Sequence, residues 1–267
     1  MLRVARQILH FLPLLGTLTA RELKARYRGS VLGFLWSLAN PLLLLAVYTF
    51  VFSVLFQPRM KGANPYALFV VSGLFPWIWL STSLLEGSMS LIANSGLIRR
   101  SAFPAELLPM VAVLSSLAHL LLAIPILVAA LAAGWVLGYR VGGWPSLLLP
   151  AVILLELPMV SGLALGFAAL NVHFKDVRDL LANLLTLLFF LTPILYPIAS
   201  LANLPLIRWV VLLSPFTPFT LAYQDTLFRG ELPPPHLWVQ MAVVSAACWA
   251  AGAWLFDRLR ETLVETA

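Results

Sequence analysis

The sequence is poor in charged residues and in cysteine. Asp, Glu, Lys and Arg together make up 10% of its 267 residues, against about 25% in soluble domains. Hydrophobic residues make up 61%, which argues against a soluble enzyme, a disordered chain and a coiled coil. Cys248 is the single cysteine, so an intrachain disulfide and a CxxC-type metal site are excluded as well. This composition is typical of a protein dissolved in lipid.

Motifs for nucleotide hydrolysis and for hydrolytic catalysis are also missing. None of the three lysines follows a glycine, so the sequence has no GxxxxGK[ST] loop for ATP. Neither HExxH nor GxSxG occurs. The four histidines are scattered, at His10, His119, His173 and His236, which argues against a metal site. We therefore predict no catalytic residue, no metal and no cofactor in this chain.

Six apolar segments are long enough to cross a membrane as helices, at about 20 residues per crossing. We place these spans at Gly33–Phe56, Tyr66–Asn94, Leu107–Leu137, Leu147–Leu170, Leu180–Tyr196 and Leu237–Phe256. Between the last two lies Pro197–His236, which is apolar but repeatedly interrupted by proline. It is too broken for a straight span and too apolar for a solvated loop, so we expect short re-entrant or interfacial helices there.

Lys and Arg are distributed unevenly over the two sides of these spans. Twelve lie on the side that holds both termini, five lie on the other, and none lies inside a span. Because cytoplasmic loops are enriched in Lys and Arg, the bias predicts that both termini are cytoplasmic. The net charge of +6 is then largely a matter of topology and does not indicate a nucleic-acid partner.

The N-terminal residues allow two interpretations. A basic start followed by the apolar stretch Ile8–Leu18 could be a secretory signal peptide. Cleavage would, however, place Arg21–Arg28 outside, against the charge bias. The alternative is an amphipathic helix on the membrane surface, ended by Pro13. Its polar and apolar faces would be Arg3, Arg6, Gln7 and His10 against Leu2, Ala5, Leu9 and Leu12, and we favour this second interpretation.

Two acidic residues fall inside predicted spans. Glu86 lies near the cytoplasmic end of the second span, within reach of water, and Glu156 lies near the middle of the fourth. An ionisable group at that depth costs about 3 kcal/mol unless it faces water or a bundle interior. Glu156 is then either a polar group in a conduit or a protonated acid bonded to the backbone of a neighbouring helix. We interpret Asp176 and Asp179 as N-cap and first turn of the fifth span, with a partner contact or a catalytic carboxylate pair as alternatives.

The most specific pattern is residues 21–43, which read RELKARYRGSVLGFLWSLANPLL. It resembles the membrane subunits of ABC exporters for O-antigen, capsule and teichoic-acid polysaccharides, within the ABC-2 permease group. Weaker matches are NVHFKD at 171–176, TPILYP at 192–197 and SPFTPFT at 214–220 with its continuation to residue 233. Lys175, Ser214 and Gln224 depart from the usual Arg, Asn and Arg. The residues that carry the main pattern are Arg21, Lys24, Arg26, Tyr27, Arg28 and Trp36.

The resemblance covers nearly the whole chain, so we treat residues 1–267 as one transmembrane domain. It implies an all-α integral membrane protein with a cytoplasmic interfacial segment (1–30), six transmembrane helices (31–256) and a cytoplasmic tail (257–267). It also implies a homodimer in the bacterial inner membrane that exports a lipid-linked polysaccharide. Two copies of a separate ABC ATPase subunit would bind ATP and Mg.

Two regions acquire roles from the same resemblance. The loop at Ser95–Glu106 would carry a coupling helix that docks on the ATPase through Leu97, Ile98, Arg99, Arg100 and Phe103. Cytoplasmic topology alone is the simpler account of the two arginines. The proline-interrupted stretch would form a periplasmic gate with Tyr196, Pro197, Pro215, Phe216, Tyr223 and Asp225.

A conduit for sugars needs aromatic faces for their C–H surfaces and polar groups for their hydroxyls. Tyr48, Phe52 and Phe56 recur every four residues on one face of the first span, and Trp77 and Glu156 are further candidates. The alternative is that these aromatic residues anchor the helices at the membrane surface or face lipid. Other functions left open are export of a drug or lipid and, less well supported, a membrane enzyme acting on lipid-linked sugars. An ion-coupled transporter would need internal repeats and several charges within the spans.

Overall fold

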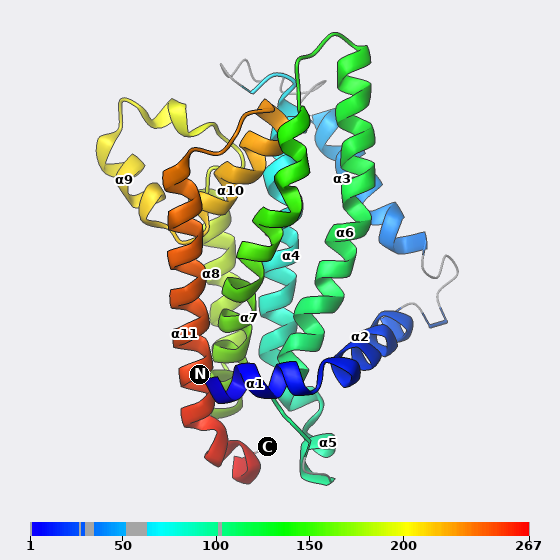
Figure 1. Ribbon diagram of the computed structural model, residues 1–267, viewed down its shortest axis with the longest axis vertical. Helices are drawn as coiled ribbons and strands as arrows, with labels where there is room; N and C mark the ends of the chain where they lie inside the picture. The colour runs from blue at the N-terminus through cyan, green and yellow to red at the C-terminus, as the bar shows by residue number, and fades with distance from the viewer. Residues whose placement is uncertain (1, 27, 30–34, 52–62, 101–102, 267) are drawn as a thin grey trace.

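The computed structural model describes residues 2–26, 28–29, 35–51, 63–100 and 103–266. Every regular element in these ranges is a helix, and the long helices lie side by side in one bundle (Figure 1). The four longest are α4 (Tyr66–Ala93), α6 (Leu107–Val136), α7 (Leu149–His173) and α11 (Pro235–Thr266). The predicted all-α class is confirmed.

Four helical segments of the described chain are long and apolar enough to cross a membrane. They are Tyr66–Ala93, Leu107–Val136, Trp144–His173 and Pro235–Leu259, which match the predicted second, third, fourth and sixth spans. The predicted first span is seen as α3 (Trp36–Thr49), and its end, with Phe52 and Phe56, lies outside the described residues. The predicted fifth span is α8 (Val177–Leu191), whose 15 residues are fewer than the usual number for a straight crossing. The total of six spans therefore stays a prediction.

The helix α4 is the centre of the bundle. Phe69, Val70 and Val71 in its first half have no accessible surface, and the helix contacts α6, α7 and α8. A helix that is apolar on all sides is expected to be surrounded by other helices in this way. Pro76 lies inside α4, and the helix continues through it.

The helices α7 and α11 approach each other more closely than ordinary side chains would allow. Gly162 of α7 faces the backbone of Cys248 and Trp249 in α11, and Gly252 of α11 faces the Gly162 carbonyl group. A Cβ atom at residue 162 would lie 2.5 Å from Trp249 Cα and 2.7 Å from the carbonyl carbon of residue 248. Glycine thus lets the two backbones meet, as small residues commonly do between membrane helices.

The proline-interrupted stretch folds into short helices, as predicted. These are η4 (Ile198–Leu201), α9 (Pro205–Leu213), α10 (Thr217–Tyr223) and the π-helical turn η5 (Gln224–Arg229). The α9 axis is bent by 91° from the continuous α10–η5 segment, which is the geometry of a broken span or a re-entrant loop. Pro205 and Pro218 each lie in the first turn of a helix, where a missing N–H costs nothing.

Gly230 ends η5 with φ = 66°, a left-handed conformation that favours glycine. Its Cα lies against the Gly142 carbonyl group, where a side chain would overlap. The Gly142 N–H donates to Phe228 O at 2.7 Å. The loop before η3 (Trp144–Leu148) is thereby fastened to the end of η5.

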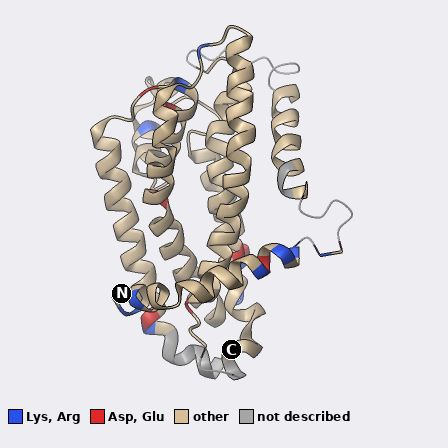
Figure 2. Ribbon diagram, turned by 45° about the vertical axis from the view of Figure 1, so that its right-hand side comes forward, with Lys and Arg blue, Asp and Glu red and all other residues tan. Residues whose placement is uncertain are grey.

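Both termini lie at one end of the bundle. The short helices α1 (Leu2–His10), α2 (Leu12–Arg26) and α5 (Ser95–Arg100) share that end, whereas α9 and α10 lie towards the other (Figure 1). Charged residues gather at the two ends and are sparse between them (Figure 2). The arrangement is that of a bundle whose middle portion faces hydrocarbon.

The N-terminal helix is interrupted two residues earlier than predicted. The break lies at Phe11, and Pro13 lies in the first turn of α2 instead of ending α1. Val4 faces the bundle and is 2% exposed, whereas Leu9 and Leu12 on the predicted apolar face are 65% and 50% exposed. These two residues of the predicted apolar face therefore point away from the rest of the chain, where a membrane surface could cover them, whereas Ala5 of the same face is half-buried.

Candidate functional site

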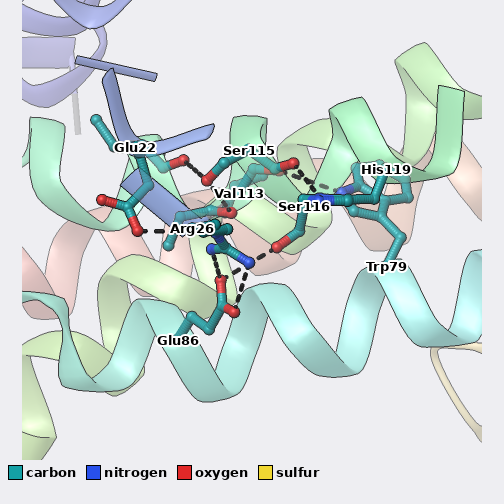
Figure 3. Close-up of polar contacts among 10 residues, drawn as sticks. Glu22, Arg26, Trp79, Glu86, Val113, Ser115, Ser116 and His119 are labelled. Atoms are coloured by element: carbon teal, nitrogen blue, oxygen red, sulfur yellow. Dashed lines mark hydrogen bonds and ion pairs between the residues drawn. The ribbon is translucent and has the colours of Figure 1, made fainter. Parts of the chain in front are cut away.

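A cluster of charged and polar side chains joins α2, α4 and α6 near the end that holds the termini (Figure 3). Arg26 Nη1 donates to Glu86 Oε1 at 2.8 Å, and Nη2 donates to Oε2 of the same carboxylate. Ser116 Oγ donates to Glu86 Oε2 at 3.4 Å, and Glu22 Oε1 lies 3.7 Å from Arg26 Nε. A two-pronged arginine–carboxylate pair fixes orientation as well as charge, so it sets how α2 lies on the bundle.

This pair explains two observations that the sequence left separate. Arg26 belongs to the 21–43 pattern, and Glu86 was the acid near the cytoplasmic end of the second span. The other basic residues of the pattern (Arg21, Lys24 and Arg28) are exposed, Trp36 is 37% exposed, and Tyr27 lies outside the described residues. Among the described residues of the pattern, Arg26 is thus the basic one that is turned inward.

The side chains of α6 continue the cluster into the bundle. His119 Nδ1 lies 2.8 Å from Ser115 O, and Trp79 Nε1 of α4 donates to Val113 O at 3.3 Å (Figure 3). These contacts direct the imidazole and the indole towards the space between α4 and α6. Polar groups therefore extend from the Arg26–Glu86 pair along the α6 surface.

The end of α7 carries a second polar junction, at Asn171. Asn171 Nδ2 donates to Ser88 O of α4 at 3.0 Å, and Asn171 Oδ1 accepts from the Arg178 N–H of α8 at 3.2 Å. Asp176 occupies the N-cap position of α8, as predicted, but its side chain makes no capping hydrogen bond. The predicted cap is therefore wrong in its chemistry, because an amide five residues earlier takes that function.

The buried acid Glu156 meets a residue predicted for the gate. Tyr223 Oη of α10 donates to Glu156 Oε2 of α7 at 2.6 Å, and the two residues are 1% and 3% exposed. Of the two interpretations of Glu156, the structure supports a bond to a neighbouring helix, with a tyrosine side chain as partner in place of a backbone group. Within the part of the chain that the structure describes, Glu156 therefore presents almost no accessible surface.

The α10–η5 segment is held by polar contacts on several sides. Gln224 Nε2 donates to Pro193 O at 2.7 Å, and Ser146 Oγ donates to Thr226 O at 2.9 Å. Asp225, which is 6% exposed, accepts from Arg229 Nη1 at 2.7 Å, one turn away. Backbone that enters an apolar bundle needs such partners, so this segment is fixed to its surroundings.

Aromatic packing adds to this attachment. The Trp77 ring lies 5.7 Å from that of Phe216 and 6.0 Å from that of Phe189, between centroids. Trp77 is 8% and Phe216 7% exposed, so Trp77 packs between helices here and does not present the conduit surface that we predicted for it.

The other residues predicted for the gate lie nearby along the chain. Pro197 is buried, Pro215 is half-buried, and the half-buried Tyr196 donates from its hydroxyl to Leu191 O at 2.7 Å.

The outer short helix α9 is the exception. Leu206, Trp209 and Leu213 on α9 are 77%, 73% and 86% exposed. Among described elements it packs mainly against α10 and η4. None of these residues was predicted as a site. The sequence feature that could have indicated them is the run of apolar residues between Pro205 and Pro215.

The predicted ATPase-docking segment is partly described. Leu97 on α5 is 39% exposed, whereas Ile98 and Phe103 are half-buried against the core. The side chains of Arg99 and Arg100 lie outside what the structure describes. Leu97 is therefore the residue of this set with an apolar surface visibly open to a partner.

Tyr48, the described member of the predicted aromatic stripe, lies half-buried on α3 beside the core. Phe52 and Phe56 fall outside the described residues, so the stripe itself stays a prediction.

Comparison with known proteins places this fold in a family. The sequence model of ABC-2 type transporters matches residues 13–228. The O-antigen export system permease protein RfbA of Myxococcus xanthus is 35% identical over 269 residues, which cover 100% of both chains. An RfbA of Klebsiella pneumoniae is 30% identical over 94% of both chains. The polysialic acid transport protein KpsM of Escherichia coli is 25% identical over 182 residues, 68% of this chain and 69% of that protein. The chain belongs to the ABC-2 type transporter family and is a transporter membrane subunit.

Proposed function

We propose that the chain is the membrane subunit of an ATP-driven exporter that moves a cell-surface polysaccharide such as O-antigen, carried on a lipid, out of the cytoplasm. The observation that carries the proposal is the similarity to an O-antigen export permease along the entire chain. The 21–43 pattern supports it, because exporters of drugs or lipids in the same family generally lack that pattern.

A separate ATPase would supply the energy. The sequence holds no phosphate-binding loop, so ATP and Mg would be bound by two copies of a partner subunit. The short helix α5 joins α4 to α6 at the end that holds both termini, where a soluble partner has access. Leu97, with Arg99, Arg100 and Phe103 in the same loop, would form the contact.

A homodimer would provide the conduit. One bundle of tightly packed helices encloses no passage for a hydrated polymer, whereas two copies can leave one along their shared interface. The helix α3 is the candidate lining, because it lies at the edge of the bundle (Figure 1) and carries Tyr48, which combines a half-buried ring with a hydroxyl group. The dimer would lie in the bacterial inner membrane, and the charge bias supports an orientation with both termini in the cytoplasm.

Deletion of the gene, followed by analysis of surface glycans, tests the function. The expected result is loss of one surface polysaccharide and its accumulation inside the cell. In cells that lack both this gene and that of the ATPase subunit, export should return when both subunits are supplied and should not return when either is supplied alone. An unchanged glycan profile, with altered drug or lipid efflux, would refute the polysaccharide assignment.

Lining by α3 has its own test. Tyr48→Ala should lower export without loss of dimer or of bound ATPase. Phe50→Ala is the matched control, since Phe50 is the C-cap residue of α3, lies two residues from Tyr48 and therefore on another side of the helix, and is 56% exposed. Equal export by the two variants would count against α3 as the lining.

A further inference from the structure

A cavity of about 280 Å³ opens between α3, α4 and α6, beside the Arg26–Glu86 pair. Arg26, Asn40, Thr82, Ser116 and His119 line one part of it. Arg26 and Asn40 both belong to the 21–43 pattern, so this cavity is where the two halves of that pattern meet the bundle.

The lining changes from polar to apolar in one direction. Along α4, away from Glu86, the lining residues run from Thr82 to Phe75, and along α6 they run from Ser116 to Ala123. Seven residues of helix span about 10 Å, so the two antiparallel helices carry the same gradient over the same length. Leu44 of α3 closes the apolar part. The cavity is therefore an amphipathic slot that enters the bundle from the charged end.

The groups in the slot are unsuited to a sugar. The indole N–H of Trp79 already donates to a backbone carbonyl, and Phe75 and Trp79 are only 4% and 2% exposed, so neither ring offers a face for stacking. Both Nη groups of Arg26 are engaged by Glu86. A hydroxyl-rich ligand would leave most of its own groups without partners in the apolar part.

A hydrocarbon chain fits the same slot. An apolar cavity of about 150 Å³ is enough to bind benzene, so 280 Å³ admits a segment of one acyl chain but not a whole lipid. The head group must then stay outside, at the level of α2. At that level Arg21, Lys24 and Arg28 are exposed. Their positive charges would attract the phosphate of an anionic lipid in the cytoplasmic leaflet.

We propose that this slot binds one acyl chain of an anionic phospholipid, whose phosphate lies beside the basic residues of α2. The proposal requires that the chain lies in a membrane with α2 at the cytoplasmic surface. It does not depend on which polymer is exported, because lipid binding is measured without transport.

Lipid retention on the intact purified protein provides the test. The protein is titrated with phosphatidylglycerol or phosphatidylcholine in detergent, and bound lipids are counted by native mass spectrometry. Phosphatidylglycerol should show one retained molecule that phosphatidylcholine does not replace. Equal retention of the two lipids would refute the role of charge.

Slot-filling variants locate that molecule. Leu44→Trp and, independently, Ala123→Leu should remove the retained phosphatidylglycerol. Leu121→Trp is the control, because Leu121 is 50% exposed on another face of α6. Retention that is unchanged in both slot variants, or lost equally in the control, would overturn the site. A change of oligomeric state with unchanged lipid would instead assign the slot to a second copy of the chain and refute the proposal.

The head-group contact is tested by Arg21→Gln with Lys24→Gln. Each removed charge should weaken phosphatidylglycerol binding about fivefold. Excess inorganic phosphate should not displace the lipid, since the acyl chain contributes to binding, and displacement would refute insertion of the chain.

Two measurements on the unaltered protein keep the proposal testable if the variants fail to fold. A phospholipid with a photoreactive group in its acyl chain should label α3, α4 and α6 around the slot, and uniform labelling of all helices would contradict the proposal. Protein from cells that make the exported polymer should also retain the phospholipid. Retention of the polymer's carrier lipid in its place, identified by mass, would assign the slot to the carrier and refute the proposal.

Discussion

Neutralising Arg26 and Glu86 tests whether charge holds α2 to the bundle. The set comprises Arg26→Gln, Glu86→Gln, the double variant and the reversed pair Arg26→Glu with Glu86→Arg. Gln keeps polarity and removes the charge, so the difference between the double variant and the sum of the single variants isolates the interaction. Glu22→Gln serves as control, because Glu22 approaches the same guanidinium only at 3.7 Å and its side chain is 47% exposed.

The expected size follows from the burial of the pair. The two side chains are 23% and 36% exposed. Exposed pairs contribute about 0.2–1 kcal/mol, and removing one partner of a fully buried pair costs about 3–5 kcal/mol. A half-buried, two-pronged pair lies between these limits, so each single variant should lower the unfolding free energy by about 2 kcal/mol, with a coupling of about 1–2 kcal/mol.

Thermal unfolding in detergent measures this effect. For domains of 150–250 residues, about 1 kcal/mol corresponds to a shift in Tm of about 2–4 °C, so each single variant should unfold about 4–8 °C lower. The double variant should unfold little lower than either single variant, and the reversed pair should recover part of the loss. Single effects that add to within about 0.5 kcal/mol would refute the reasoning, as would an equal effect of the Glu22 control.

Three further predictions concern packing, the buried acid and the partner contact. Gly162→Ala should lower Tm despite a gain in helix propensity, because its Cβ would lie 2.5 Å from Trp249 Cα, whereas Gly16→Ala, with open space around it, should raise or keep Tm. Equal shifts would contradict the close approach. Tyr223→Phe should cost about 1–3 kcal/mol in unfolding experiments, because it leaves a buried carboxyl group without its hydrogen-bond donor; an unchanged Tm would refute this. Leu97→Glu should reduce co-purification of the ATPase subunit while dimerisation persists, and normal co-purification would exclude this residue from the contact.

The positions of the long helices could be predicted because residues close to each helix end determine where the helix stops. Apolar runs end at Gly, Pro and charged residues, so α4 and α6 were located to within a residue or two at each end. The places of Glu86 and Glu156 along α4 and α7 also followed from counting residues, whereas their depth in a membrane stays a prediction. Two predicted spans are the exceptions. The fifth corresponds to α8, which has only 15 residues, and much of the first lies outside the described residues.

The pairings could not be predicted, because each depends on how distant helices are placed. Arg26 and Glu86 were both expected near the cytoplasmic surface, so equal depth and opposite charge were the available hints. Tyr223 lies in the bent segment formed by α9, α10 and η5, whose placement no periodicity gives, so its bond to Glu156 could be seen only in the fold. Asn171 was missed as a cap because it belongs to the preceding helix, whereas Asp176 has the expected position and residue type.

One continuous helix connects the end that would receive a partner with the end that holds the bent segment of α9, α10 and η5. The helix α4 passes into the loop with α5 at its C-terminus, and near its N-terminus Phe69 contacts Phe228 with ring centroids 5.5 Å apart. Arg26 holds this helix at Glu86, nine residues or about 13 Å before α5 begins. If ATP-driven motion enters at α5, α4 is the direct route to α10, and the ion pair lies where that motion would begin. Variants that weaken the pair should therefore reduce export by more than their loss of Tm explains, which is why both quantities must be measured on the same set.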